Sequence, residues 1–256
     1  MGAFQSGQGV SLSNWKNNWA SILSSTRVVF DEADEAGLLD EILLAGVPRV
    51  LAFVNAHAMN LLAERDDLLQ PLLDANYLLR DGSGMRILYR LMGLSAGINM
   101  NGTDFIPKVL EKYKGKRIAI WGTQEPYLSD AATNIKHRFN LEVVSIQHGF
   151  ESIEYYTGLS KKIQVDLILL GMGMPKQEQL AHQLRKTNAN TLIICGGAII
   201  DFLGNKVSRA PNWIRQLGLE WLYRLICEPK RLFKRYVIGN PQFIYRALLL
   251  RLWSCR

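Results

Sequence analysis

The feature that most constrains the fold of this chain is an alternation of short apolar runs with longer segments of helical periodicity. The apolar runs are rich in β-branched residues and end in glycine or polar residues. We expect strands at residues 49–55, 77–79, 117–121, 142–146, 166–170 and 191–195, and the clearest helices at 34–44, 58–64, 102–113, 129–139 and 175–185. Such alternation is typical of βα units. We therefore predict a Rossmann-like α/β fold with a mostly parallel sheet flanked by helices.

The positive charge of the chain is concentrated near its C-terminal end. The formal net charge is +7, but residues 209–256 hold ten Lys or Arg and only two acids, which gives them +8 and leaves the remainder at about −1. The strands also stop before this region, and residues 213–226, 229–238 and 241–253 are predicted to form three short basic helices separated by prolines. We therefore predict a loose leader over 1–25, an α/β core over 26–205 and a basic amphipathic helical appendage over 206–256.

Cysteine and histidine usage argues against a disulfide framework and against a metal site. The three cysteines are widely spaced, and the four histidines form no ligand motif, so we expect neither a metal nor another cofactor. The first residues lack the pattern of a signal peptide, and no apolar stretch reaches the length of a membrane span. We therefore expect a protein of the reducing cytoplasm whose contact with any membrane is peripheral.

The loops that follow the predicted strands are the candidate ligand-binding segments, because ligands of such sheets bind at the carboxyl ends of the strands. The loop after the second strand contains Asp81 next to Gly82. A lone carboxylate there can approach a ligand closely and act as a general base. An ordinary Asp-Gly turn would have the same sequence. The segment alone leaves both interpretations open.

Two later loops show a similar ambiguity. After the fifth strand, Gly173 and Lys176 lie where a helix begins, and the free N–H groups of a helix N-terminus favour a phosphate. A glycine-rich turn that only packs the helix on the strand fits equally well. After the sixth strand, Asp201 follows two glycines and is placed either to accept hydrogen bonds from a base or sugar or to cap a helix. The loop after the third strand begins at Gly122 and leads to Ser129, a candidate helix N-cap.

The basic appendage also has two interpretations. Apolar residues recur at helical spacing, and the arginines lie elsewhere on the helical wheel. Cations with aromatic residues suit an anionic bilayer surface, and arginines can neutralise a diphosphate. The alternative is a helical cap whose apolar stripe packs on the core while its arginines are solvated.

The loops and the appendage together resemble the WecG/TagA/CpsF family of glycosyltransferases, over about residues 50–236. The motifs that carry the resemblance are Asp81-Gly82-Ser83-Gly84, Gly173-Met174-Pro175-Lys176-Gln177-Glu178, Gly196-Gly197 with Asp201-Phe202, Arg209-Ala210-Pro211, and Gly218-Leu219-Glu220-Trp221-Leu222-Tyr223-Arg224 followed by Glu228-Pro229 and Arg231. The resemblance implies an inverting, metal-independent hexosyltransferase. It would move a sugar from a UDP-sugar to a sugar on undecaprenyl diphosphate, in the synthesis of a bacterial surface polysaccharide or exopolysaccharide.

The resemblance also assigns roles to residues of this chain. It makes Asp81 the general base, places Asp201 near the uracil, and brings Arg224 and Arg231 of the appendage to the diphosphate. The remaining expected substrate-binding residues are Asn55, Gly82, Asn101, Gly122, Gly173, Lys176, Gln177 and Gly197. The expected partners are the UDP-sugar, the lipid-linked acceptor sugar and an anionic membrane surface at the cytoplasmic face of the inner membrane. The sequence is also compatible with a homo-oligomer.

Two departures from the family pattern limit these expectations. Many relatives have a threonine where this chain has Phe53, and an arginine where it has Asn99. These changes suggest a different sugar or acceptor from that of the best-known members, so N-acetylmannosamine is not assumed. The main competing hypothesis is a membrane adaptor that keeps the pocket without catalysis. Nucleic-acid binding by the basic appendage is not expected, because the near-neutral core offers no continuous basic track.

Overall fold

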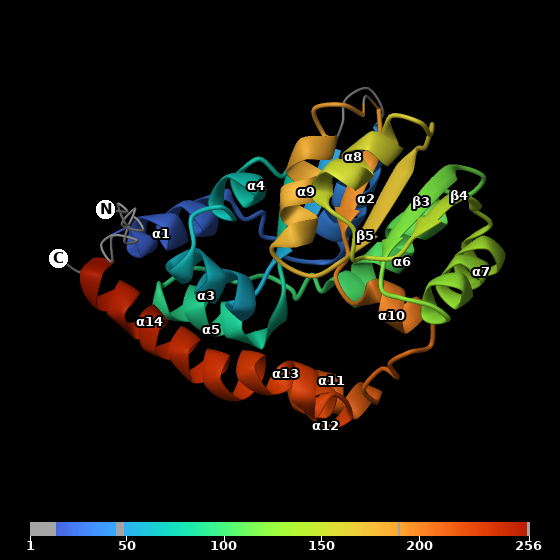
Figure 1. Cartoon of the computed structure of the whole chain (residues 1–256). Coiled ribbons are helices and arrows are strands. Elements are labelled where there is room, and N and C mark those ends of the chain that lie inside the picture. Colours follow the sequence, from blue (N-terminus) through green and yellow to red (C-terminus); the bar gives the residue numbers. More distant parts are fainter. Residues whose placement is uncertain (1–13, 45–48, 189, 255–256) are drawn as a thin grey trace, which may run out of the picture.

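The computed structural model describes residues 14–44, 49–188 and 190–254. Its centre is a six-stranded parallel sheet with strand order β2-β1-β6-β5-β3-β4. Figure 1 labels β3, β4 and β5 of this sheet. The strands are β1 (Arg49–Val54), β2 (Tyr77–Arg80), β3 (Arg117–Gly122), β4 (Glu142–Gln147), β5 (Leu167–Gly171) and β6 (Leu192–Cys195). The predicted α/β fold class and all six predicted strands are confirmed, with boundaries that differ by one residue at most. Every strand pair is parallel, so the loops after the strands gather at one edge of the sheet.

Helices cover both faces of the sheet, which is why the inner strands are continuous apolar runs rather than alternating ones. Strands β1, β2 and β6 are buried at every position, whereas the edge strand β4 is not. One face is covered by α2 (Glu32–Leu43), α6 (Gly102–Lys112) and α7 (Tyr127–Phe139), and the other by α3 (Ala56–Glu64), α5 (Gly82–Leu91), α8 (Ile153–Ser160) and α9 (Lys176–Leu184). Two short helices, α4 (Leu69–Leu73) and α10 (Ile199–Leu203), complete the core.

The N-terminal segment differs from its prediction. Residues 15–25, expected to belong to a loose leader, form the helix α1 (Trp15–Ser25), and residues 1–13 lie outside the described part of the chain. Trp19 is fully buried, donates a hydrogen bond from Nε1 to the Met59 carbonyl oxygen at 2.7 Å, and stacks on Phe243 with 5.4 Å between ring centroids. Because Trp19 joins α1 to the core, the leader cannot extend through residue 25.

The C-terminal segment consists of α11 (Asn212–Gln216), α12 (Glu220–Cys227), α13 (Pro229–Phe233), the π-helical turn η1 (Lys234–Ile238) and α14 (Gly239–Ser254). The break expected before Pro241 is absent, because α13, η1 and α14 follow one another without a gap. A proline lacks the N–H that would bond to the preceding turn, and a π-helical turn lies at this point instead of a helix end. Figure 1 shows α14 running along α3 and α5 towards α1.

Helix α14 packs on the core rather than standing apart from it. Phe243, Ala247 and Leu250 are buried in the same apolar cluster as Trp19. Asn60 of α3 donates a hydrogen bond from Nδ2 to the Gly239 carbonyl oxygen at 2.7 Å, and Arg246 donates to Asn60 Oδ1 at 2.9 Å. Removing the appendage would therefore expose part of the core. None of the helices in the described ranges is both long enough and apolar enough to cross a bilayer.

Candidate active site

A cleft of about 950 Å³ lies at the carboxyl edge of the sheet. Its floor comes from the loops after all six strands, and its opposite wall comes from α12, α13, η1 and the start of α14 in the appendage. Eight residues expected from the sequence to belong to a site line it: Asn55, Asp81, Gly173, Gln177, Gly197, Asp201, Arg224 and Arg231. The topology therefore brings together residues that are up to 176 positions apart, Asn55 and Arg231.

The carboxylate of Asp81 lines the cleft and is not used to cap a helix. It occupies the N-cap position of α5, but its side chain makes no capping hydrogen bond. Burial raises the pKa of Asp81, and the charge of Arg235 and a hydrogen bond from Asn55 partly oppose that rise. The Asn55 side-chain oxygen caps α3 by accepting from the N–H groups of His57 and Ala58, both at 3.1 Å, so its amide nitrogen remains to serve Asp81. These features suit a general base.

A buried arginine next to Asp81 ties the end of β2 to the segment around residues 96–98. Arg80 donates from Nε to the Ala96 carbonyl oxygen at 2.7 Å and from Nη2 to the Ile98 carbonyl oxygen at 2.6 Å. Asn99 accepts a hydrogen bond from the Gly82 N–H at 2.7 Å. Asn99 therefore supports the backbone next to Asp81, which gives a structural role to one of the two departures from the family pattern.

Gln177 shapes the cleft through the glycine loop after β6. Its Oε1 accepts from the Gly197 N–H at 3.1 Å, and its Nε2 donates to Glu178 Oε1 at 2.7 Å. Glu178 is buried, and the loss of solvation raises its pKa to about 7. Both ends of the Gln177 amide are thus engaged within the protein, and the amide fixes the position of Gly197.

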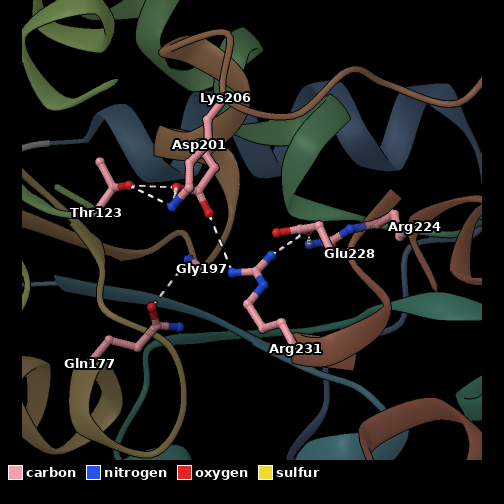
Figure 2. A network of polar contacts seen from close by, with 8 residues as sticks. All are labelled: Thr123, Gln177, Gly197, Asp201, Lys206, Arg224, Glu228 and Arg231. Carbon is pink, nitrogen blue, oxygen red and sulfur yellow. Dashed lines mark hydrogen bonds and ion pairs between the residues drawn. The ribbon is translucent and has the colours of Figure 1, made fainter. Parts of the chain in front are cut away.

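Asp201 links three parts of the molecule, as Figure 2 shows. Its Oδ1 accepts from Thr123 Oγ1 at 2.6 Å and from Lys206 Nζ at 3.1 Å, and its Oδ2 lies 3.5 Å from Arg231 Nη1. Asp201 lies within α10 rather than at its cap, so the helix-cap interpretation is wrong. Its carboxylate connects the loop after β3 with the appendage across the cleft.

The two arginines expected at a diphosphate already have acidic partners. Glu228 lies 2.6 Å from Arg231 Nη2 and 3.8 Å from Arg224 Nη2 (Figure 2). Arg224 also lies over the Phe202 ring, 5.5 Å from its centroid. An incoming anion would therefore compete with Glu228 for these two guanidinium groups.

Arg235 is the functional candidate that the sequence analysis missed. It lies in η1 and lines the cleft, and its Nε is buried without a hydrogen-bond partner among the described residues. Burial, followed by the charge of Arg235, lowers the pKa of the cleft residue His57 to about 4. Arg235 follows Arg231 by four positions, so helical spacing within the basic appendage was the available signal. A guanidinium whose Nε is buried without a partner among the described residues is suited to an anionic ligand.

Four predicted residues do not line the cleft. Lys176 donates to the Gly149 carbonyl oxygen at 2.9 Å and lies over Tyr156, so it braces the loop before α8. Asn101 caps α6 by accepting from the Asp104 N–H at 2.9 Å. Gly122 permits close strand packing, because a Cβ there would lie 2.6 Å from the Gly171 backbone. Gly82 lies next to Asp81 at the start of α5.

Ser129, the candidate N-cap, lies inside α7, which begins at Tyr127, so the prediction that it caps this helix is wrong.

Titratable side chains do not gather into a metal-ligand set in the part of the chain that the structure describes. No group of three or more His, Cys, Asp and Glu side chains there is arranged to hold a metal ion. The expectation of a metal-independent reaction stays a prediction.

Comparison with known proteins identifies the family of this chain. The model of the "Glycosyl transferase WecG/TagA/CpsF family" matches residues 23–255. The chain belongs to this glycosyltransferase family. It is therefore a hexosyltransferase, and the predicted family and enzyme class are confirmed. One relative, from Bacillus subtilis (strain 168), is named N-acetylglucosaminyldiphosphoundecaprenol N-acetyl-beta-D-mannosaminyltransferase. It is 27% identical over 205 residues, which cover 78% of this chain and 78% of the relative.

Proposed function

We propose that this family member transfers a sugar from a UDP-sugar to a sugar carried on undecaprenyl diphosphate, with inversion and without a metal. The observation that carries the proposal is the cleft itself, in which the carboxylate of Asp81 faces a wall that contains Arg224, Arg231 and Arg235. The name of the Bacillus subtilis relative supports the class of acceptor. The product would be a lipid-linked precursor of a cell-surface polysaccharide.

The proposed reaction is a single displacement. Asp81 takes the proton of the acceptor hydroxyl, and the hydroxyl oxygen forms a bond to the anomeric carbon of the donor sugar. The bond from that carbon to the UDP oxygen breaks on the opposite face, and UDP leaves with the bonding electron pair. Guanidinium groups stabilise the charge that develops on the departing phosphate.

We propose that Arg235 joins Arg224 and Arg231 in binding diphosphate. Arg231 is held by Asp201 and Glu228, whereas the buried Nε of Arg235 has no partner within the described ranges. Binding at Arg235 therefore requires no ion pair with another described residue to break. The N-terminus of α9, next to Gly173, adds partial positive charge on the other side of the cleft.

The identity of the donor sugar is left to experiment because the cleft differs from the family pattern. Phe53 lines the cleft and packs beside Gly102, where an added Cβ would lie 3.4 Å from the Phe53 ring. An aromatic ring offers no hydroxyl to hydrogen-bond a sugar. A mannosamine donor is therefore not carried over from the Bacillus subtilis relative.

A panel of UDP-sugars, incubated with a short-chain prenyl-diphosphate sugar as acceptor, tests the proposed function. We expect mass spectrometry to show a single added sugar with one donor or a few related donors, and NMR to show an inverted anomeric centre. The Asp81→Asn variant serves as the control for background transfer. If every donor fails while UDP still binds, the result favours the non-catalytic adaptor instead.

We also propose that the appendage docks the protein at the cytoplasmic face of the inner membrane. Large apolar side chains are exposed there beside basic residues, a pattern that suits an anionic bilayer surface. Exposed examples are Trp213, Leu217, Ile226, Phe233 and Leu252. In this proposal, residues 26–205 hold the donor, and residues 206–256 complete the cleft at the membrane.

Vesicle sedimentation tests the docking proposal. We expect the wild-type protein to sediment with vesicles that contain phosphatidylglycerol more than with phosphatidylcholine vesicles. Combined Ile226→Ser and Phe233→Ser substitutions should weaken that binding. Phe30→Ser is the matched control, because Phe30 is 57% exposed on the core and Phe233 is 53% exposed on the appendage. Equal loss in both variants would contradict docking through the appendage.

A further inference from the structure

A second cavity lies on the appendage and is distinct from the cleft. It is an apolar groove of about 730 Å³, within the size range of about 300–1,000 Å³ that ligand pockets occupy. We call it the appendage groove. Its lining residues come from α12, η1 and α14: Trp221, Leu222, Leu225, Tyr236, Val237, Asn240, Pro241, Ile244, Tyr245 and Leu248. No charged side chain of the described residues lines it.

The appendage groove and the cleft lie on two sides of the same helical segments. In α12, Arg224 lines the cleft, whereas its neighbour Leu225 lines the groove. In η1, Arg235 lines the cleft and Tyr236 lines the groove. The guanidinium groups are therefore separated from the apolar groove by the thickness of one helix.

The groove is open to the molecular surface. Tyr245 is 64% exposed and Leu248 is 47% exposed, although both line the cavity. Exposed apolar residues outside the groove, such as Ile226 and Leu252, continue this surface. A long apolar chain can therefore enter the groove from the side that we propose to face the membrane.

We propose that the appendage groove binds the prenyl chain of the lipid acceptor. The inference rests on the proposed function, in which the acceptor sugar enters the cleft while it is still attached to its diphosphate and prenyl chain. In such an acceptor, a charged diphosphate is joined directly to an apolar chain. In this part of the protein, a basic wall of the cleft lies directly beside the apolar groove. Contact with a bilayer surface alone would require exposed apolar residues but no concave site.

The proposal predicts a dependence on chain length. Burial of apolar surface strengthens binding by up to about fourfold per methylene group. The KM of the acceptor should therefore fall as isoprene units are added and should stop falling once the groove is filled. A groove with no role would give a KM that is independent of chain length in the absence of vesicles.

Leu248→Gln and Leu252→Gln form a matched pair for the test. Both residues lie on α14, one helical turn apart, but only Leu248 lines the groove. In a vesicle-free assay, Leu248→Gln should raise the KM of a long-chain acceptor by about tenfold, as expected for a lost leucine contact. It should leave kcat and the KM of a single-isoprene acceptor unchanged, and Leu252→Gln should change neither KM. Equal effects of the two variants, or equal effects on both acceptors, would overturn the proposal.

Calorimetry separates a failure of the groove from a failure of the proposed function. We expect farnesyl diphosphate to bind the wild-type protein more tightly than isopentenyl diphosphate, and Leu248→Gln to remove that difference. Discrimination without any sugar transfer would leave the groove proposal intact and contradict the proposed function. Transfer without discrimination would support the proposed function and overturn the groove proposal.

Discussion

Arg231 of the appendage and Asp201 of the core form an ion pair across the cleft, with Arg231 Nη1 3.5 Å from Asp201 Oδ2. Asp201 is 9% exposed at its side chain and also accepts from Thr123 and Lys206. This pair connects the appendage to α10, the helix that follows the glycine loop after β6. The position of Arg231 in the cleft therefore depends on a carboxylate of the core.

Asp201→Asn should loosen this connection. The change removes the charge that pairs with Arg231 and Lys206, while an amide oxygen can still accept from Thr123. Because Arg231 is about half exposed, we expect a loss of only about 1–2 kcal/mol in the free energy of unfolding, measured by urea denaturation. Asp40→Asn, which breaks an exposed pair with Lys112, is the control and should have almost no effect. Equal effects would mean that the Asp201 pair adds nothing beyond a surface pair.

Arg235→Gln should change the pH dependence of transfer. The charge of Arg235 lowers the pKa of Asp81, so its removal should move the acid limb of kcat/KM to higher pH. The loss of a cation that lines the cleft should also reduce kcat/KM by at least about tenfold. Arg235→Lys keeps the charge, so the acid limb should stay near its wild-type position. An unshifted acid limb in Arg235→Gln would exclude coupling between Arg235 and Asp81.

Glu178 should make the folded protein less stable as the pH rises. Its pKa is about 7 in the folded protein and 4.5 in a solvated chain, so the unfolded state releases the proton at lower pH. The free energy of unfolding should therefore fall between about pH 4.5 and 7 and level off above that range. Urea titrations across this range should show a fall of about 2–3 kcal/mol relative to Glu178→Gln. Parallel pH profiles for the two proteins would contradict a pKa of Glu178 raised by burial.

Trp19→Ala should show that α1 belongs to the core. The side chain is fully buried between α1, α3 and α14, and its truncation should cost about 3–5 kcal/mol of unfolding free energy. Trp213→Ala is the matched control, because Trp213 is 63% exposed on the appendage. We expect its effect to stay within about 0.5 kcal/mol by thermal or urea denaturation. A small change in unfolding free energy for Trp19→Ala would instead support the predicted loose leader over residues 1–25.

The sheet was predictable because a parallel strand that is buried on both faces must be a continuous apolar run. All six predicted strands have this property except the edge strand β4, where β-branched residues still gave a signal. Helix α5 was not among the clearest predicted helices, because it begins in the glycine-rich segment at Gly82 that also resembles a loop. Helix α1 was missed because the polar residues before Trp15 suggested an unstructured segment.

The site was only partly predictable. Loops after parallel strands meet at one edge, which placed Asn55, Asp81 and Gly197 together from the sequence. The pairing of side chains could not be predicted in this way, because it depends on tertiary packing. Sequence alone therefore could not show that Glu228 engages Arg231, or that the buried Nε of Arg235 lacks a hydrogen-bond partner within the described ranges.

The most direct test of the account is the rate of sugar transfer by Asp81→Asn, with the donor that the UDP-sugar panel identifies. Asparagine has nearly the same shape as aspartate but cannot accept the proton of the acceptor hydroxyl. We expect kcat to fall by about 10²–10⁴-fold, while the circular dichroism spectrum and the affinity for UDP stay unchanged. A transfer rate equal to that of the wild-type protein would contradict the assignment of Asp81 as the general base.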